Sequence, residues 1–194
     1  MPAPPRPLRV LGVDTANKES AVALVVDGQL VSALREERLT RARFDRSMPV
    51  QATQRVLRAA GLHVDDIDLI VGNVDQEALR AALGVAGTPP QGSRLPRRAD
   101  GPEAHGYHHL AHAALAFYTS PFDEALVVTI DAEGDNDTLV AFRARRDAGF
   151  ERLTAIAKQP VRIGGVYEDM TRLLGFGQGG EGKLMGLAAF GQPD

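Results

Sequence analysis

A pair of histidines offers the clearest chemistry in the sequence. His108 and His112 are four residues apart in segment 107–118, whose apolar pattern predicts a helix. This spacing places both imidazoles on one helix face, with Cβ atoms about 5–6 Å apart, so one metal ion could bind both. His109 points elsewhere and is expected to cap or pack. A purely structural histidine pair is the alternative. The zinc-peptidase motif H-E-x-x-H is excluded because His109, not glutamate, follows His108.

Two histidines make an incomplete metal site, so a carboxylate is expected nearby. Asp131 ends a predicted buried strand over 125–131 and is the natural oxygen donor. Asp135 and Asp137 are alternatives, but the run from Asp135 to Asp137 is typical of a hairpin turn. We therefore expect Asp131 to join the two histidines, with a remaining ligand still to be supplied.

The C-terminal segment is rich in glycine, with seven glycines between Gly175 and Gly191. Glycines let the backbone approach a ligand closely, and Lys183 could contact a phosphate oxygen. Gly177, Gly182 and Lys183 match part of a phosphate-binding P-loop, but leucine stands where the magnesium-binding Ser or Thr should follow. The P-loop interpretation is therefore rejected, and a flexible surface loop is the alternative to a ligand-binding one.

The predicted elements repeat one order, three strands followed by a helix. Each copy opens with a strand that ends in aspartate, at Asp14 and Asp131. Two such lobes could enclose a nucleotide and its metal ion, whereas two unrelated segments with turn-forming aspartates are the alternative. The strands are expected over 8–14, 20–26, 30–36, 67–72, 125–131, 137–143 and 150–156, and the helices over 49–60, 76–83, 107–118 and 166–174.

Composition excludes several classes of protein. The chain has 194 residues, a formal net charge of −3 and no cysteine, so disulfides and cysteine-bound metals are impossible. No apolar run approaches the ~20 residues of a membrane span. The proline-rich N-terminus lacks the apolar core of a signal peptide, which predicts a cytoplasmic protein that does not bind a membrane. The mild acidity argues against a general nucleic-acid binder.

Several motifs in order resemble one known family. They are similar to the O-carbamoyltransferases of nodulation-factor, cephamycin and aminoglycoside-antibiotic pathways. The resemblance covers nearly the whole chain from residue 8. It is carried by Glu36-Glu-Arg-Leu-Thr-Arg41, His108-His-Leu-Ala-His-Ala-Ala-Leu-Ala-Phe-Tyr118, Ser120-Pro-Phe-Asp-Glu-Ala125, Thr129-Ile-Asp-Ala-Glu-Gly134 and Gly180-Glu-Gly-Lys-Leu-Met-Gly-Leu-Ala188.

This resemblance implies an α/β fold of the actin-like ATPase superfamily. Its two RNase H-like lobes would be similar to those of the tRNA threonylcarbamoyl transferases (TsaD-like). Residues 1–7 would form a disordered arm, 8–120 the first lobe, and 121–194 the start of an incomplete second lobe. The YrdC-like domain that makes carbamoyl adenylate in such proteins would be absent.

The resemblance also implies a reaction and its ligands. A carbamoyl group would pass from carbamoyl adenylate, made from carbamoyl phosphate and ATP, to a hydroxyl of a small-molecule acceptor such as a natural product or sugar. The metal would be iron, with zinc as the alternative, held by His108, His112 and Asp131. The adenylate would be bound by residues from two segments, namely Gly164, Gly165, Asp169, Gly179, Gly180, Glu181 and Lys183.

At one position the sequence departs from the family. Members commonly carry His-Asp-Ser after the first strand, and here Lys18, Glu19 and Ser20 stand instead. Glu19 could replace the carboxylate, but a protonated Lys18 cannot act as a base at neutral pH. The predicted catalytic set is therefore Lys18, Glu19 and Asp14. Either Lys18 contacts phosphate or the acceptor, or the acceptor chemistry differs from that of the family.

Three functional hypotheses follow. The first is an O-carbamoyltransferase completed by a complementary chain or by C-terminal sequence beyond these residues. The second is a non-catalytic binding or regulatory subunit on the same scaffold. The third is threonylcarbamoyl transfer to tRNA, against which the lack of a basic RNA-binding stripe argues.

Overall fold

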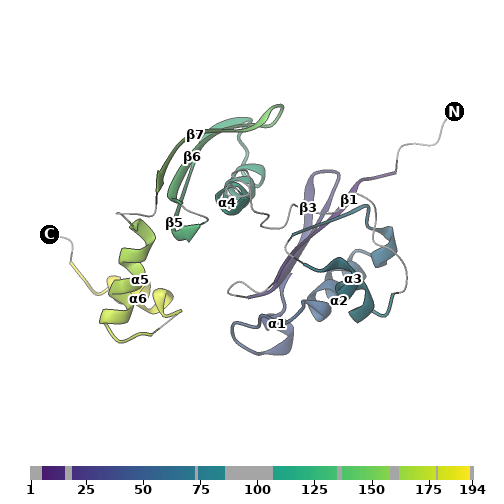
Figure 1. Ribbon diagram of the computed structural model, residues 1–194, viewed down its shortest axis with the longest axis horizontal. Coiled ribbons are helices and arrows are strands. Elements are labelled where there is room, and N and C mark those ends of the chain that lie inside the picture. The colour runs from purple at the N-terminus through teal and green to yellow at the C-terminus, as the bar shows by residue number, and fades with distance from the viewer. Residues whose placement is uncertain are drawn as a thin grey trace. The chain divides into compact units, whose positions relative to one another are not determined.

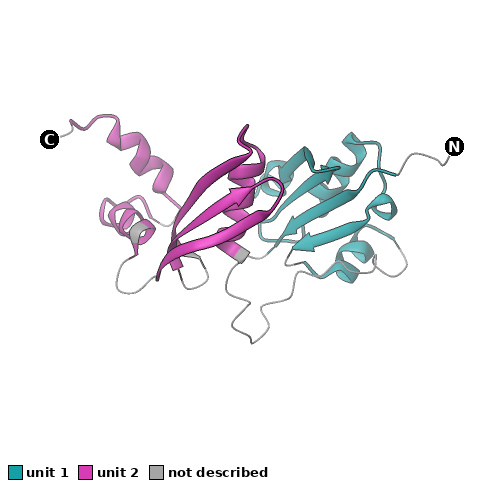
Figure 2. Ribbon diagram, turned by 90° about the horizontal axis from the view of Figure 1, so that it is seen from above, with its two compact units in different colours: residues 1–97 teal, residues 98–194 magenta. Residues whose placement is uncertain are grey.

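A computed structural model describes residues 6–15, 19–72, 74–85, 107–134, 137–157, 162–177 and 179–192. The chain forms two compact units, residues 1–97 and residues 98–194, coloured separately in Figure 2. Each unit is an α/β structure built around its own sheet, which Figure 1 shows with labelled elements. The α/β class predicted from sequence is confirmed.

The first unit has a four-stranded sheet in the order β3-β2-β1-β4. Strands β1 (Arg9–Asp14), β2 (Ala21–Val26) and β3 (Gln29–Arg35) form the predicted antiparallel meander. Strand β4 (Leu69–Gly72) pairs with β1 in parallel, so β1 has a neighbour on each side. Asp27 and Gly28 both have positive φ, the conformation that a tight two-residue hairpin turn requires.

Short helices join these strands. They are α1 (Glu37–Thr40), α2 (Val50–Ala59), the 3-10 turn η1 (Val64–Asp66) and α3 (Gln76–Ala82). Helices α2 and α3 lie close to their predicted positions. Helix α1 is not among the helices predicted from the sequence, because its four residues form a single turn that is too short to show a periodic pattern.

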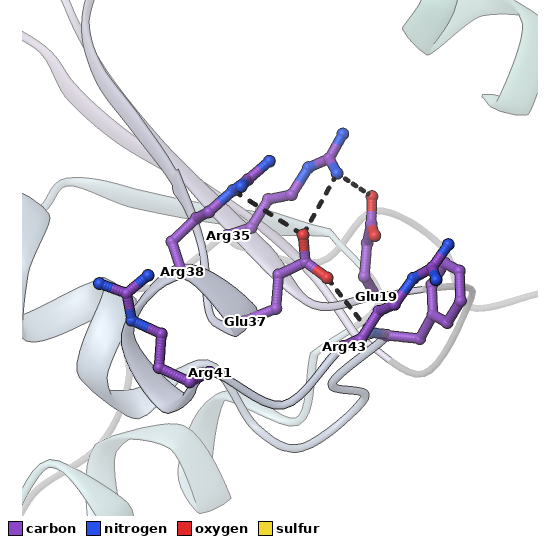
Figure 3. Close-up of a pocket in the computed structure, with 7 residues that line it drawn as sticks. Glu19, Arg35, Glu37, Arg38, Arg41 and Arg43 are labelled. Carbon is purple, nitrogen blue, oxygen red and sulfur yellow. Dashed lines mark hydrogen bonds and ion pairs between the residues drawn. The ribbon is translucent and has the colours of Figure 1, made fainter. Parts of the chain in front are cut away.

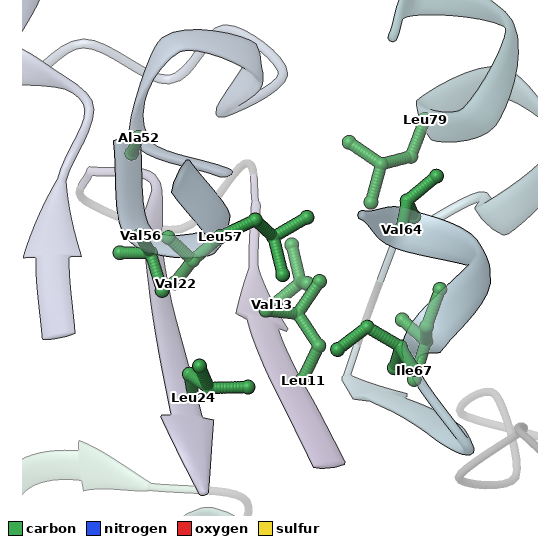
Figure 4. Close-up of a cluster of buried hydrophobic side chains, with 11 residues drawn as sticks. Leu11, Val13, Val22, Leu24, Ala52, Val56, Leu57, Val64, Ile67 and Leu79 are labelled. Atoms are coloured by element: carbon green, nitrogen blue, oxygen red, sulfur yellow. The ribbon is translucent and has the colours of Figure 1, made fainter. Parts of the chain in front are cut away.

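The core of the first unit lies between one sheet face and these helices, as Figure 4 shows. Alternate residues of β1 and β2 point inward because side chains along a strand alternate between its two faces. They pack against apolar residues of α2, η1, β4 and α3. The buried set comprises Leu11, Val13, Val22, Leu24, Ala52, Val56, Leu57, Val64, Ile67, Ile70 and Leu79.

A buried glutamate fastens the loop after β3 to helix α2. Glu36 is 2% exposed, and its two carboxylate oxygens accept hydrogen bonds from the backbone N–H groups of Gln51 (3.0 Å) and Ala52 (2.7 Å). These N–H groups belong to the first turn of α2, where no intrahelical acceptor exists for them. Glu36 therefore caps a helix that starts 14 residues further along the chain.

We predict that Glu36→Gln lowers the free energy of unfolding by about 2 kcal/mol, because an amide N–H₂ would replace one of two buried acceptors. Chemical denaturation monitored by circular dichroism measures this change. Glu77→Gln, at an exposed position in the first turn of α3, is the matched control and should cost less than about 1 kcal/mol. Equal losses for the two variants would contradict the capping role.

The second unit contains α4 (Tyr107–Tyr118), β5 (Glu124–Gly134), β6 (Asp137–Arg145) and β7 (Gly149–Ala157). Its strands form an antiparallel sheet in the order β5-β6-β7. Helix α4 covers one sheet face, where Ala113 and Phe117 join a buried cluster with Val127, Val140, Phe142 and Ala144. Helix α4 and these strands therefore belong to the same compact unit.

Two further helices complete the second unit. Helix α5 (Ile163–Leu173) begins three residues before the predicted start. Helix α6 (Glu181–Ala188) occupies part of the run expected to be a glycine-rich loop, so that expectation is wrong for these residues. Good helix formers separate Gly182 from Gly186, and this local preference outweighs the two glycines.

The N-terminal arm and the possibility of a membrane span are the two remaining expectations from the sequence. Of the predicted disordered arm, residues 1–5 lie outside the described residues. Arg6 is held by an ion pair with Asp68, so the expectation fails for that residue. Among the described residues, none of the helices is long and apolar enough to cross a membrane.

Candidate metal centre

Helix α4 is fixed to the sheet by a buried histidine. His109 is 2% exposed, with Nδ1 at 2.7 Å from the Thr129 hydroxyl and Nε2 at 3.1 Å from the Asp137 carbonyl oxygen. A carbonyl oxygen only accepts hydrogen bonds, so Nε2 carries a proton and donates it. The expectation that His109 points elsewhere and packs is confirmed, and the contact sets the position of the helix over β5.

The alternation of β5 brings Asp131 to the same helix. Val127 and Thr129 are buried beneath α4, and Asp131 lies two residues further along on the same face of the strand. The Ala132 N–H donates to Asp131 Oδ1 at 2.7 Å, and the Thr138 hydroxyl donates to the Asp131 carbonyl oxygen at 2.7 Å. These bonds hold the end of the strand and leave Oδ2 directed at the histidines.

Three side-chain atoms converge at this point. Asp131 Oδ2 lies 2.6 Å from His108 Nε2 and 3.3 Å from His112 Nε2, and the two histidine nitrogens are 3.0 Å apart. The side chains are 40%, 53% and 30% exposed for His108, His112 and Asp131, so solvent reaches the group. The structure thus brings together all three residues that the sequence predicted as metal ligands.

The local charge favours the ionised carboxylate. The hydrogen bond from His108 lowers the pKa of Asp131 far below its usual value, and the Ala132 N–H and the charges of both histidines act in the same direction, against partial burial. An ionised carboxylate beside two imidazoles offers one oxygen and two nitrogens to a cation. The arrangement can therefore act as a three-point metal ligand set.

The distances fit this interpretation. Nitrogen and oxygen ligands bound to a divalent metal at about 2.0–2.1 Å lie about 3.0–3.4 Å from one another. Two of the three separations in the structure, 3.0 and 3.3 Å, fall in this range, and the third is a 2.6 Å hydrogen bond that metal binding would replace. Two imidazoles and one carboxylate on one side of an exposed site match the donor set of non-haem iron and of catalytic zinc.

Helix α5 approaches the same strand end through a glycine. A Cβ placed on Gly164 would lie 2.3 Å from the Ala132 nitrogen and 2.5 Å from the Asp131 carbonyl carbon. Backbone therefore packs directly on backbone beside the predicted metal ligand. The adjacent Gly165 is buried against the Arg162 side chain. Both glycines, predicted to bind adenylate, thus also have a packing role.

The other residues predicted to bind adenylate lie on α5, on α6 and just before α6. Asp169 is exposed on α5 and forms an ion pair with Arg172 at 3.6 Å. Gly180 precedes α6, and its carbonyl accepts the Lys183 N–H at 2.8 Å. Lys183 is exposed, while Glu181 and Gly179 are partly buried. Their ligand-binding role stays a prediction.

The predicted catalytic residues belong to the first unit. Asp14 is exposed at the end of β1, and the Glu19 carboxylate forms an ion pair with Arg35 at 2.8 Å. Lys18 lies outside the described residues. In the second unit, the alternative ligand Asp137 is engaged with Arg152 at 2.7 Å, and Asp135 is outside the described residues.

Sequence reasoning missed the residues that hold the metal ligands in place. Thr129 binds His109 and the Val140 carbonyl oxygen, and Thr138 binds the Asp131 carbonyl oxygen. Thr129 carries a signal that could have identified it, because it shares the inward face of β5 with Val127 and Asp131. A polar residue on such a face needs a partner, and the nearby histidines were candidates.

We predict that Gly164→Ala costs about 1–3 kcal/mol of stability, because the added methyl would overlap the Asp131–Ala132 peptide. Thermal unfolding followed by circular dichroism measures the loss. Gly182→Ala, in α6, is the control: nothing lies within 4 Å of the added Cβ, so stability should be unchanged or slightly higher. A neutral Gly164→Ala would show that the close approach is not required.

Comparison with known proteins supports the sequence resemblance. A family model described as "Carbamoyltransferase N-terminus" matches residues 9–84 and 91–194. An uncharacterized protein of Synechocystis, sll1178, is 32% identical over 95% of this chain and 35% of that protein. The nodulation protein NolNO of Sinorhizobium fredii is 30% identical over 93% of this chain and 29% of that protein. The chain therefore spans about a third of the length of these relatives.

Solved structures give a weaker likeness. YeaZ from Pseudomonas aeruginosa has a TM-score of 0.40 at 12% identity, over 79% of this chain and 70% of that chain. The (R)-2-hydroxyglutaryl-CoA dehydratase component A of Acidaminococcus fermentans has a TM-score of 0.43 at 18% identity, over 86% and 54%. The family model, in contrast, covers most of the sequence, including all three converging ligands. The chain belongs to the carbamoyltransferase family and corresponds to the N-terminal part of its members.

Proposed function

We propose that the chain is the metal-binding part of an O-carbamoyltransferase. It would transfer a carbamoyl group from carbamoyl adenylate, made from carbamoyl phosphate and ATP, to a hydroxyl of a natural product or sugar. Family membership supports the transferase class. The observation that carries the proposal is the convergence of His108, His112 and Asp131 within a sequence region that the family model covers.

The proposed metal is iron, with zinc as the alternative, bound by His108 Nε2, His112 Nε2 and Asp131 Oδ2. When bound, it would supply Lewis-acid stabilisation of negative charge on the reacting carbonyl and phosphate oxygens. Asp131 keeps its charge at neutral pH because His108 and the Ala132 N–H stabilise the anion. His109 keeps α4 in register with β5, so both ligand histidines stay directed at Asp131.

The transfer itself breaks one bond and forms one. The acceptor hydroxyl oxygen attacks the carbamoyl carbon, the bond from that carbon to the phosphate oxygen breaks, AMP leaves, and the hydroxyl proton passes to a base or to water. We propose that Lys183 offsets charge on the phosphate, and that the Gly164–Gly165 and Gly179–Glu181 segments and Asp169 hold the adenylate. An exposed ammonium group such as that of Lys183 suits a phosphate as a point charge.

The base is proposed among Asp14 and Glu19 of the first unit. The Glu19 carboxylate forms an ion pair with Arg35 at 2.8 Å, which restricts the positions that this candidate base can take. Lys18 would contact phosphate or acceptor as a cation, because lysine side chains generally carry a proton at neutral pH, and it would not accept the hydroxyl proton.

We further propose that a complementary chain or further C-terminal sequence covers part of the second unit. On β5, Leu126, Val128 and Ile130 are 67%, 49% and 57% exposed, on the sheet face opposite α4. In the first unit, β1 pairs with β2 and β4, whereas β5 pairs only with β6 among the described strands. An apolar face beside an open strand edge suits an added strand and the elements that follow it.

We predict that the purified chain binds about one equivalent of iron or zinc, and that His112→Ala lowers this stoichiometry at least fivefold. Elemental analysis after dialysis measures it. Lowering the pH from about 7.5 to about 5 should release the metal, because histidine ordinarily titrates near pH 6.5 and only neutral imidazole binds metal.

His63→Ala is the matched control, because His63 is exposed in the first unit and its ring contacts Asp65. It should leave metal content unchanged. Equal metal content in the His112→Ala variant and the parent would contradict the site. A metal-free parent would favour the binding or regulatory subunit over the enzyme.

We predict that the chain, assayed with its completing polypeptide, releases AMP from ATP only when carbamoyl phosphate and a hydroxyl acceptor are present. His112→Ala should lower the rate by about 100-fold or more, because the transition-state charge loses its stabilisation. Quantitation of AMP by chromatography measures this. A folded, metal-loaded assembly without carbamoyl-phosphate-dependent AMP release would reject the proposal, and AMP release that requires threonine, bicarbonate and tRNA would favour threonylcarbamoyl transfer.

A further inference from the structure

A second candidate site lies in the first unit, at the end of β3. Figure 3 shows a pocket of about 440 Å³ between β3, α1 and the turn that follows. Four arginines and two glutamates surround it together with one aromatic ring, so its formal charge is +2. The lining residues are Glu19, Arg35, Glu37, Arg38, Arg41, Arg43 and Phe44. None of them belongs to the proposed metal centre.

The pocket is built on a fixed frame. The buried Glu36 holds the start of α1 to helix α2. Asp45 closes the turn: it accepts the Thr40 hydroxyl at 2.6 Å and the Ser47 N–H at 2.8 Å, and its carbonyl accepts the Ser20 N–H at 2.8 Å. Hydrogen bonds from Ser47 and Thr40 lower the pKa of Asp45, so this anchor stays ionised. The arginines are therefore presented by a segment that is ordered before any ligand arrives.

The backbone of this segment is strained at two positions. Arg41 ends α1 with φ 62°, and Phe44 has φ 58°, the left-handed region that non-glycine residues rarely adopt. The Phe44 N–H donates to the Glu37 carboxylate at 3.1 Å, which fixes this conformation. Such conformations are kept where the surrounding structure enforces them, and they cluster at ligand-binding sites.

The glutamates organise the arginines without saturating them. Glu19 binds Arg35 closely, at 2.8 Å, whereas Glu37 lies 3.6 Å from Arg35 and 3.8 Å from Arg38. Each guanidinium carries five N–H donors, so donors remain for a ligand. In Figure 3, Arg41 has no dashed contact to the other residues drawn. The Arg43 guanidinium lies 4.7 Å from the centre of the Phe44 ring, a cation–π contact that restricts its motion.

We propose that this pocket binds the phosphate group of a small molecule. A cationic surplus of two matches a phosphate dianion, and arginine forks bind phosphate oxygens in pairs. The cations come from a strand, a helical turn, its C-terminal cap and the following turn, so their donors are not confined to one plane. This suits a tetrahedral oxyanion better than a flat carboxylate. The phosphate could be free phosphate, carbamoyl phosphate or a nucleotide, and the test distinguishes them.

The test is isothermal titration calorimetry of the 194-residue chain at low salt, with inorganic phosphate, carbamoyl phosphate and AMP in separate runs and acetate as the planar monoanion. At least one phosphate compound should bind about tenfold more tightly than acetate. The compound that binds most tightly identifies the source. The proposed carbamoyl transfer is not required for this result, because the readout is binding without turnover.

The variants Arg38→Gln and Arg41→Gln should each weaken phosphate binding about tenfold. Arg55→Gln is the control, because Arg55 is an exposed arginine of helix α2 outside the pocket. This variant removes the same charge as the pocket variants. It should change affinity less than about twofold. Circular dichroism checks that all three variants fold as the parent does.

Four outcomes would overturn the proposal. The first is binding of acetate as tightly as of every phosphate compound. The second is the same loss of affinity for Arg55→Gln as for Arg41→Gln, which would indicate a diffuse charge effect. The third is binding of an acidic peptide without binding of any phosphate compound, which would indicate a protein-contact surface. AMP binding that is lost in Lys183→Gln but kept in Arg41→Gln would place the phosphate at the second unit and would also overturn it.

Discussion

The candidate metal centre depends on the contact between His109 and Thr129. A helix lying on a sheet can slide or rotate while it still buries its apolar face, because hydrophobic packing is not directional. The bonds from His109 to Thr129 and to the Asp137 carbonyl are directional, and they fix the helix along the strand. His108 adjoins His109, and Asp131 lies two residues after Thr129. The same bonds therefore bring the candidate ligands His108 and Asp131 together.

The side-chain periods of two elements then complete the site. The strand repeats every two residues, so Asp131 emerges on the helix side of β5. The helix repeats every 3.6 residues, so His112 lies one turn from His108. The resulting group is partly exposed, which a catalytic metal site needs because substrate must reach it. The buried pair sets the geometry, and the exposed triad is available for chemistry.

The sequence predicted the structure well where its residues follow the helix or strand period closely. The histidine spacing and the strand-end aspartate predicted the three converging residues, and the two meanders emerged near their expected positions. Helix α6 was missed because Gly182 and Gly186 resemble loop residues, although neither glycine needs its conformational freedom there. Glu36 was also missed as a helix cap, because it meets α2 only after the chain has folded back. Long-range partners of this kind leave no mark in local sequence patterns.

The two units contain similar meanders but differ in how the outer edge of the first strand is paired. In the first unit, β4 covers the open edge of β1, and the loop after β3 is tied down by Glu36 and Asp45. In the second unit, β5 carries the proposed metal ligand Asp131 and exposes Leu126, Val128 and Ile130 on its other face. Both features share one strand, so whatever packs on the exposed face also restricts the end of the strand. The proposed chain that covers β5 would thereby set the position of Asp131 and, with it, the affinity of the proposed metal site.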